Sequence, residues 1–211
     1  MKPSNPTGLY LILDHDLLAG RSLTDIAAQA MAGGVKSIQY RAKNLSKREA
    51  YFNALQLRAL SRQSGVTFLI NDGVDLALAT EADGVHLGQE DLPLSAARAL
   101  LGSDRLIGIS AHTLEQAKEA EAGGADYLGI GPIYSSTTKQ DRPPLGCEAL
   151  KQFRKHVRIP LVAIGGISPL NVRQVMTTRV DGVAVVSAIL SRSDVTRATA
   201  DLVAILQTRR I

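Results

Sequence analysis

The sequence predicts an α/β fold, a single (β/α)8 TIM barrel formed by residues 1–211 as one domain. Three observations lead to this prediction. Short apolar or β-branched runs alternate with longer amphipathic stretches, as in parallel strands joined by helices. Most short runs contain no alternating polar residues, so both of their faces are expected to be buried. The chain has 211 residues, and barrels of this class begin near ~200.

Eight runs fit the strands of such a barrel. A weak repeat with one or two glycines stands just before four of them, at Gly33-Gly34, Asp83-Gly84, Gly123-Gly124 and Asp181-Gly182, where glycine ends the preceding helix. A doubly wound open sheet is the alternative, but the Gly-x-Gly-x-x-Gly pattern that usually follows its first strand is missing. The expected strands are Leu9–Leu13, Val35–Gln39, Thr67–Ile70, Gly84–Leu87, Leu106–Ile109, Tyr127–Ile130, Leu161–Ile164 and Val183–Val186. The expected helices include Leu23–Met31, Lys47–Ser64, Leu114–Ala122, Leu170–Met176 and Val195–Gln207.

The composition narrows the class of protein. Trp is absent, aromatic residues make up 4% of the chain, and the basic residues behind the net charge of +4 are scattered, so no nucleic-acid partner is expected. No run approaches the ~20 apolar residues of a membrane span, and the first apolar run, Leu9–Leu13, is too short for a signal peptide. We expect a cytoplasmic chain that binds small molecules and contacts no membrane. The sequence does not define its oligomeric state.

Polar or glycine-rich groups follow nearly every expected strand, where barrel enzymes place their active sites. Arg41 and Lys43 follow the second expected strand and share one side of an extended chain with Gln39. A guanidinium, an ammonium and an amide together suit a diphosphate. The alternative is a solvent-exposed pair of charges. Their position at the end of a buried strand favours the binding site.

Two carboxylates follow the third and fourth expected strands. Asp72 and Asp91 should lie near each other because adjacent parallel strands end at the same edge, and Asn71 would orient Asp72 or a substrate. Mg2+ is usually held by one or two carboxylates together with phosphate oxygens and water, so this pair predicts a Mg2+ site. The alternatives are a plain turn at Asp72-Gly73 and a helix N-cap at Asp91, although capping does not exclude metal binding.

A second phosphate site is expected after the last two strands. Gly165-Gly166 and Val186-Ser187 occupy the loops that bind phosphate monoesters in many barrels, although Ser187 could instead be a helix cap. The long loop Ser135–Pro144 carries Lys139 and several hydroxyls, which favours a lid over a disordered excursion. Three side chains are interpreted without a chemical role: His86 as a core or lining residue, His112 beside a Thr113–Gln116 capping box, and Cys147.

At these positions the chain resembles the thiamine phosphate synthase family. The similarity runs from Leu9 to Leu190, and the order and spacing of its motifs are specific. The motifs are Gln39-Tyr40-Arg41-Ala42-Lys43, Asn71-Asp72, Gly84–Asp91, Ser110–Thr113, Gly129–Tyr134, Thr138-Lys139, Ala163–Ile167 and Val186–Ile189.

The resemblance implies a Mg2+-assisted transferase. Members of the family join 4-amino-2-methyl-5-(diphosphooxymethyl)pyrimidine to a thiazole phosphate, either 4-methyl-5-(2-phosphoethyl)thiazole or its carboxylate, and release pyrophosphate by a dissociative displacement. By this resemblance Asp72 and Asp91 would bind Mg2+, and the catalytic residues would be Arg41, Lys43, Ser110 and Lys139. Substrate contacts would come from Gln39, Tyr40, Arg41, Ala42, Lys43, Asn71, Ser110, Ser136, Thr137, Thr138, Lys139, Gly166, Val186 and Ser187.

One departure and three alternatives accompany the resemblance. The family's lid usually begins with Pro-Thr, whereas this chain has Ser135-Ser136 and so keeps a hydroxyl at residue 136. A thiazole tautomerase-like paralogue would carry a catalytic histidine where this chain has Pro132. A sugar-phosphate epimerase or isomerase would need an acid–base pair that the expected barrel mouth does not offer. A non-catalytic barrel that binds thiamine precursors stays open, and a turnover assay would separate it from an enzyme.

Overall fold

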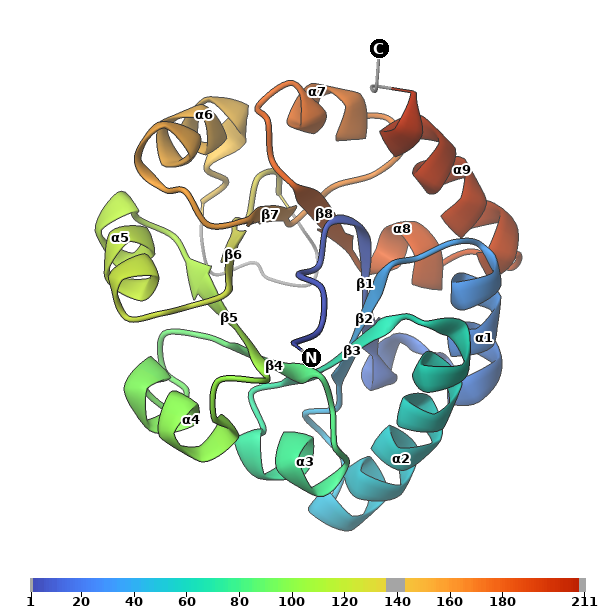
Figure 1. Ribbon diagram of the computed structural model, residues 1–211. Coiled ribbons are helices and arrows are strands. Elements are labelled where there is room, and N and C mark those ends of the chain that lie inside the picture. The colour runs from blue at the N-terminus through green and yellow to red at the C-terminus, as the bar shows by residue number, and fades with distance from the viewer. Residues whose placement is uncertain (1, 136–142, 209–211) are drawn as a thin grey trace.

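The computed structural model describes residues 2–135 and 143–208. Its strands pair in parallel with their neighbours in sequence, and the last pairs with the first, so the sheet closes into the barrel that the sequence predicts (Figure 1). The bounds are β1 Gly8–Asp14, β2 Ser37–Arg41, β3 Thr67–Asn71, β4 Gly84–Leu87, β5 Leu106–Ala111, β6 Tyr127–Ile130, β7 Leu161–Ile164 and β8 Gly182–Val185.

Helices surround the barrel as an outer ring (Figure 1). Several begin and end where local chemistry dictates: α2 starts at a Ser46–Glu49 capping box, α5 starts at the predicted Thr113–Gln116 box, and Gly65 ends α2 in the left-handed conformation. None of the described helices is long and apolar enough to cross a membrane. The bounds are η1 His15–Leu17, α1 Leu23–Ala32, α2 Lys47–Ser64, α3 Val74–Ala79, α4 Leu94–Leu101, α5 Leu114–Ala122, α6 Gly146–His156, α7 Val172–Met176, α8 Ser187–Leu190 and α9 Val195–Gln207.

The second strand lies two residues later than the sequence predicts. The expected range was 35–39, whereas β2 covers Ser37–Arg41. Gly34, with a φ of 95°, turns the chain after α1, and the strand then continues until Arg41 pairs in register with Asp14 of β1. Arg41 is therefore a strand residue rather than the start of a loop.

Two apolar cores share the barrel wall. The larger core lies between the strands and the helices. The smaller core fills the barrel and consists of Tyr10, Ile12, Leu69, Leu106, Tyr127, Val162 and Ala184. Because successive side chains of a strand point to opposite faces, residues two apart from these also point inward. The interior is thus packed, and a ligand has room only at its ends.

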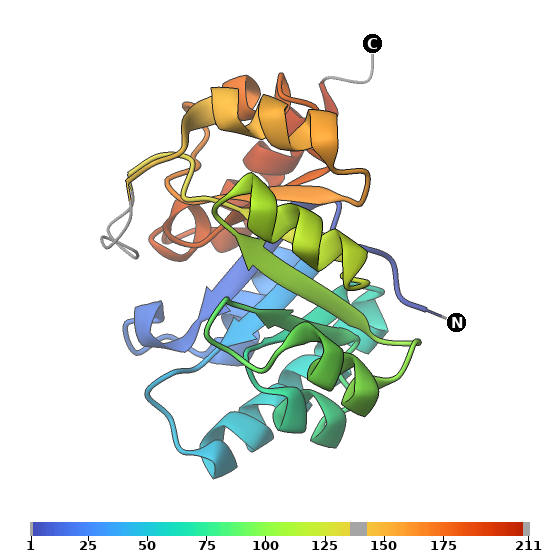
Figure 2. The ribbon, with the colours of Figure 1, turned by 90° about the vertical axis from the view of Figure 1, so that its left-hand side faces the viewer.

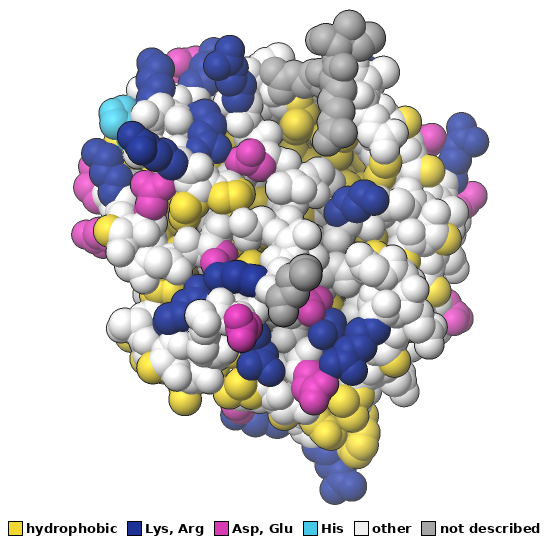
Figure 3. All heavy atoms as spheres, in the orientation of Figure 1, with side chains coloured by type: hydrophobic (Ala, Val, Ile, Leu, Met, Phe, Trp, Pro, Cys, Tyr) yellow, Lys and Arg dark blue, Asp and Glu magenta, His cyan; other side chains and the backbone are white. Residues whose placement is uncertain are grey.

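Ion pairs repeat at the end of the barrel where the strands begin. An aspartate stands directly before each of β4, β6 and β8. Its carboxylate accepts a backbone N–H from the preceding strand and pairs with an arginine of the helix that leads into that preceding strand. Basic and acidic side chains are correspondingly interleaved on this face (Figure 3). The pairs are Arg58–Asp83 at 2.9 Å, Arg98–Asp126 at 2.6 Å and Arg154–Asp181 at 2.9 Å.

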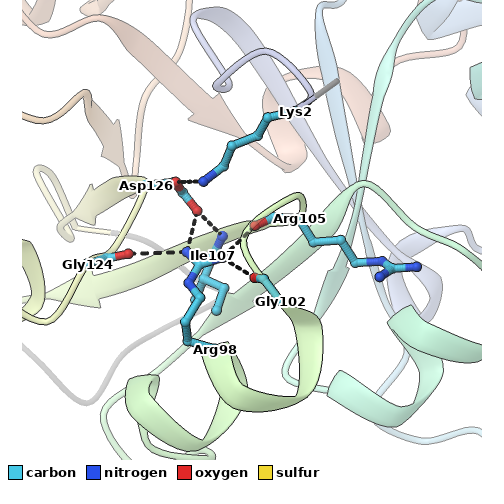
Figure 4. A network of polar contacts seen from close by, with 7 residues as sticks. All are labelled: Lys2, Arg98, Gly102, Arg105, Ile107, Gly124 and Asp126. Atoms are coloured by element: carbon cyan, nitrogen blue, oxygen red, sulfur yellow. Dashed lines mark hydrogen bonds and ion pairs between the residues drawn. The ribbon is translucent and has the colours of Figure 1, made fainter.

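The N-terminal arm crosses this same end of the barrel (Figures 1 and 2). Lys2 Nζ lies 2.5 Å from Asp126 Oδ1, and Asp126 Oδ2 accepts both the Arg98 guanidinium and the backbone N–H of Ile107 (Figure 4). The side chain of Asp126 is only 13% exposed, so these three donors satisfy a largely buried carboxylate. This end of the barrel is a structural closure, opposite the carboxyl ends of the strands.

Candidate active site

The carboxyl ends of the strands form the barrel mouth, on the side away from the N-terminus (Figure 2). All eight strands are parallel, so the residues at their ends converge there even though they are far apart in sequence. Arg41 and Asn71 end their strands, Ser110 is the penultimate residue of β5, and Val186 directly follows β8. The structure thus places these four residues at the same end of the barrel.

Arg41 is held by Asp14, a partner that no local sequence pattern indicates. Its Nη1 donates to Asp14 Oδ2 at 2.5 Å, and Asp14 is 3% exposed. The carboxylate both neutralises and orients the guanidinium at the end of β2. Asp14 stands directly after the first expected strand, but only the β1–β2 register shows that it faces Arg41.

Lys43 lies beyond the end of β2, and more than half of its side chain is exposed. Its Nζ is 3.3 Å from Asp72 Oδ2, which follows β3. The predicted cations and the predicted carboxylates are therefore next to one another rather than in separate parts of the mouth.

Asp72 and Asp91 are neighbours, as the sequence predicts. Burial, together with the nearby carboxyl of Asp91, raises the pKa of Asp72, and Lys43 partly offsets this effect. Asp91 Oδ2 accepts the backbone N–H of Gly88 at 2.6 Å. The N-cap interpretation of Asp91 is wrong, because α4 begins at Leu94 with Pro93 as its N-cap.

The carboxylate pair fits a hard divalent cation. Two carboxylates close enough to raise a pKa repel each other, and a cation between them would remove that repulsion. No group of three or more His, Cys, Asp or Glu side chains that could hold a metal occurs among the residues described. Mg2+ suits such a pair because it normally takes one or two carboxylates and completes its shell with phosphate oxygens and water.

Asp72 also has an unusual backbone. Its φ of 63° lies in the left-handed region, which is uncommon for residues other than glycine. The backbone N–H of Asp72 donates to the carbonyl of His86 at 2.9 Å, which ties the turn to β4. Strain of this kind is often found at functional sites, where the surrounding structure holds it.

The substrate-binding residues assigned to β2 do not all face the mouth. Gln39 points into the barrel, is 2% exposed, and donates from Nε2 to the Tyr10 hydroxyl at 2.6 Å. Tyr40 points outward and accepts from Asn53 Nδ2 of α2 at 3.1 Å. Ala42 packs against the outer core. A ligand at the mouth would therefore meet Tyr40 and Ala42 through their backbone atoms.

The loops after β7 and β8 are adjacent because these strands pair. Gly165 and Gly166 have φ values of 95° and 64°, and a Cβ on Gly166 would stand 2.6 Å from the Ser135 carbonyl oxygen. The glycine is thus required by the approach of the segment after β6. Ser187 is the first residue of α8, and Val186 is its N-cap. Four residues predicted in the lid lie outside the described part of the chain: Ser136, Thr137, Thr138 and Lys139.

Ser110 and two histidines complete the described mouth. Ser110, on β5, shares a 2.9 Å hydrogen bond between its Oγ and His86 Nε2. His86 is partly buried and makes a second bond through Nδ1 to the Tyr127 hydroxyl. His112 Nδ1 lies 2.5 Å from the Gly131 carbonyl, which ties β5 to the segment after β6. From the sequence both histidines are interpreted without a chemical role, and no local pattern connects His86 with Ser110.

The family model described as thiamine monophosphate synthase matches residues 9–189. The chain belongs to the thiamine monophosphate synthase family. It is 48% identical to the thiamine-phosphate synthase of Chloroflexus aurantiacus over 199 residues. The alignment covers 94% of this chain and 92% of that protein. It is 49% identical over 188 residues to that of Syntrophomonas wolfei, covering 89% and 90% of the two chains.

A solved structure of the same family superimposes closely. The thiamine phosphate pyrophosphorylase from Pyrococcus furiosus matches with a TM-score of 0.90 and 41% identity, covering 97% of each chain. These similarities confirm the family that the sequence motifs indicate.

Proposed function

We propose that the chain is a thiamine-phosphate synthase. It would join 4-amino-2-methyl-5-(diphosphooxymethyl)pyrimidine to a thiazole phosphate, giving thiamine phosphate and pyrophosphate. The observation that carries the proposal is the contact between Lys43 and Asp72 at 3.3 Å, which supports an arrangement in which an ammonium would bind phosphate beside a carboxylate pair that would bind Mg2+. Family membership supports the same activity. Residues 1–211 would act as one catalytic domain, in the cytoplasm and on small molecules.

The diphosphate would bind between cations from two parts of the mouth. Arg41, fixed by Asp14, presents a planar guanidinium, and Lys43 adds a mobile ammonium. Asp72 and Asp91 would hold Mg2+, which when bound supplies positive charge against the leaving pyrophosphate. Asn71 ends β3 beside them, and Lys139 would add a further cation from the lid.

The residues of the mouth favour bond breaking before attack. Donors that bind pyrophosphate more tightly as its charge develops would lower the barrier to its departure. The electron-rich aminopyrimidine would carry the positive charge left behind, and the thiazole nitrogen would then attack. No side chain has to remove a proton in this path. This agrees with the roles proposed for the mouth residues, none of which is a general acid or base. Closure of Ser135–Pro144 would exclude water from the cation.

The thiazole phosphate would bind on the opposite side of the mouth, after β7 and β8. Gly166 brings its backbone to this edge, and the exposed Ser187 adds a hydroxyl and an N–H. Val186 and the hydroxyls of Ser136, Thr137 and Thr138 would complete the set. Two separate phosphate sites would then hold the two substrates on either side of the reacting carbon.

The proposed reaction is tested by pyrophosphate release from the purified protein. Release that requires the pyrimidine diphosphate, the thiazole phosphate and Mg2+ together, with thiamine phosphate as the co-product, supports the proposal. Binding of both substrates without release would instead indicate a barrel that only binds thiamine precursors. Isomerisation of a thiazole phosphate without pyrophosphate release would indicate a tautomerase.

A Lys139→Ala variant tests the role proposed for the lid. Lys139 is expected to act on the departing pyrophosphate, so the substitution should lower kcat much more than it weakens substrate binding. Equal losses in binding and in kcat/KM, with kcat unchanged, would show that Lys139 only contributes uniform binding.

A further inference from the structure

A chain of hydrogen bonds crosses the interior of the barrel and ends at Ser110. Gln39 Nε2 donates to the Tyr10 hydroxyl at 2.6 Å, and the Tyr10 and Tyr127 hydroxyl oxygens lie 3.2 Å apart. Tyr127 Oη is 2.9 Å from His86 Nδ1, and His86 Nε2 is 2.9 Å from Ser110 Oγ. The chain joins five strands, from the buried Gln39 on β2 to Ser110 at the mouth.

Two glycines make room for this chain. A Cβ on Gly108 would stand 2.1 Å from Tyr127 Cζ, and a Cβ on Gly129 would stand 2.9 Å from His86 Cε1. Both glycines lie inside strands, where neither has a positive φ. Glycine is therefore needed at these positions to leave room rather than to permit an unusual backbone conformation. The two rings fill the volume that side chains at 108 and 129 would occupy.

The donors in the chain follow one direction. Gln39 Nε2 donates to the Tyr10 oxygen, which leaves the Tyr10 proton available for Tyr127. In the same direction, the Tyr127 hydroxyl would donate to His86 Nδ1. Burial raises the pKa of both tyrosines, so each keeps the proton that this direction requires. A neutral imidazole that accepts at Nδ1 carries its proton on Nε2.

We propose that His86 is a positioning residue for Ser110. His86 donates from Nε2 to Ser110 Oγ, and this bond leaves the Ser110 proton directed to the mouth, where an anionic oxygen accepts it. Tyr127 sets the tautomer of His86. The Ser110 backbone is held separately, because Gln89 Nε2 donates to the Ser110 carbonyl at 2.6 Å. The inference rests on the proposed function, in which Ser110 binds the departing diphosphate.

Tyr127→Phe is the first test, because it removes one hydroxyl and keeps the ring. We expect kcat for pyrophosphate release to fall roughly 10-fold, which is the size of one lost hydrogen bond. KM for the thiazole phosphate should stay unchanged. In a Ser110→Ala background the same substitution should cost nothing further, because the chain would no longer reach the substrate. Equal losses in both backgrounds would overturn the proposal and show a packing role.

Thr199→Val is the matched control. It also removes a fully buried hydroxyl, one that bonds Val195 in α9 on the outside of the barrel. It should leave kcat unchanged. His86 itself is tested by rescue: His86→Gln, which keeps a nitrogen donor, should retain more kcat than His86→Leu. Equal losses in these two variants would contradict a donor role for Nε2.

The tautomer is measured independently of turnover. In spectra of protein labelled with 15N-histidine, the His86 Nδ1 should resonate as the unprotonated nitrogen, and this preference should weaken in Tyr127→Phe. A proton on Nδ1 would overturn the proposal. If the wild-type protein releases no pyrophosphate, the proposed function fails, while the tautomer and its dependence on Tyr127 still decide whether the hydrogen-bond chain orients His86.

Discussion

Lys43 Nζ lies 3.3 Å from Asp72 Oδ2 at the barrel mouth, although the two residues belong to loops that follow different strands. The contact joins the cationic and acidic parts of the candidate site. Lys43 lowers the pKa of Asp72, whereas burial and Asp91 raise it, and the net direction is upward. Without a metal, the acidic pair is thus only partly neutralised by the protein's own charges.

Asp72→Asn tests this balance through stability. Because the folded pKa of Asp72 is raised, its ionised form opposes folding at neutral pH, and this unfavourable contribution disappears as pH falls through the folded pKa. Without Mg2+, Asp72→Asn should be more stable than wild type at neutral pH by up to about 1 kcal/mol, and the gap should close on acidification. Urea unfolding of both proteins over a pH series measures this difference in stability.

Asp75→Asn is the control for that experiment. Asp75 is exposed, and its hydrogen bond with Lys47 lowers its pKa. Its contribution to stability is therefore present at neutral pH and is lost as pH falls, which is the opposite sign. Mg2+ should raise the unfolding temperature of wild type and of Asp75→Asn but not of Asp72→Asn. A rise in all three would remove Asp72 from the metal site.

Asp91→Ala should abolish Mg2+-dependent turnover while the fold is kept. The variant would lack one carboxylate of the proposed metal site and the acceptor for the Gly88 N–H. Circular dichroism and pyrophosphate release, each measured with and without Mg2+, separate the two effects. Full activity in the variant would show that the metal is held elsewhere.

Arg41→Lys should lower kcat/KM for the pyrimidine diphosphate by about 100-fold, because an ammonium cannot replace the planar guanidinium that Asp14 orients. Asp14→Asn should give a smaller loss of the same kind. Arg62→Lys is the control, since Arg62 pairs with Glu81 on exposed surface. Steady-state kinetics with the thiazole phosphate saturating measure the effect, and similar values for the three variants would contradict it.

Asp126→Ala should destabilise the fold without changing kcat. The substitution leaves Arg98, Lys2 and the Ile107 N–H without their shared acceptor in a largely buried position, at a cost of about 2–3 kcal/mol. Asp201→Ala is the control, because its i,i+4 pair with Arg197 is exposed and contributes about 0.3 kcal/mol. Equal urea unfolding midpoints for Asp126→Ala and Asp201→Ala would show that the contacts of Asp126 do not contribute to stability.

Gly166→Ala should raise KM for the thiazole phosphate. Gly166 and Gly65 both have a φ of 64°, but a Cβ on Gly65 would meet nothing within 4 Å, whereas one on Gly166 would crowd the Ser135 carbonyl. Gly65→Ala therefore measures the conformational cost alone, about 1 kcal/mol. Any additional loss of stability in Gly166→Ala measures the clash with the Ser135 carbonyl. Equal stability and equal KM in the two variants would remove Gly166 from the site.

Much of the fold could be predicted because its signals are local. Buried strands appear as uninterrupted apolar runs, and the Thr113–Gln116 capping box is contained within four residues. The convergence of strand ends follows from parallel pairing alone, so Arg41, Asp72 and Asp91 could be assigned to one mouth before the structure was known. The start of β2 could not, because the turn at Gly34 and the pairing with β1 set it.

By itself the sequence determined the barrel, its mouth and the residue types that the mouth presents. Only the tertiary structure decided that Asp14 holds Arg41, that Gln39 is buried, and that His86 bonds Ser110. These contacts depend on strand register and on side chains that meet across the interior, such as Tyr10 and Tyr127, which are 117 residues apart. A local pattern specifies which face of an element is apolar, but the partner of a polar group is fixed only when the barrel closes.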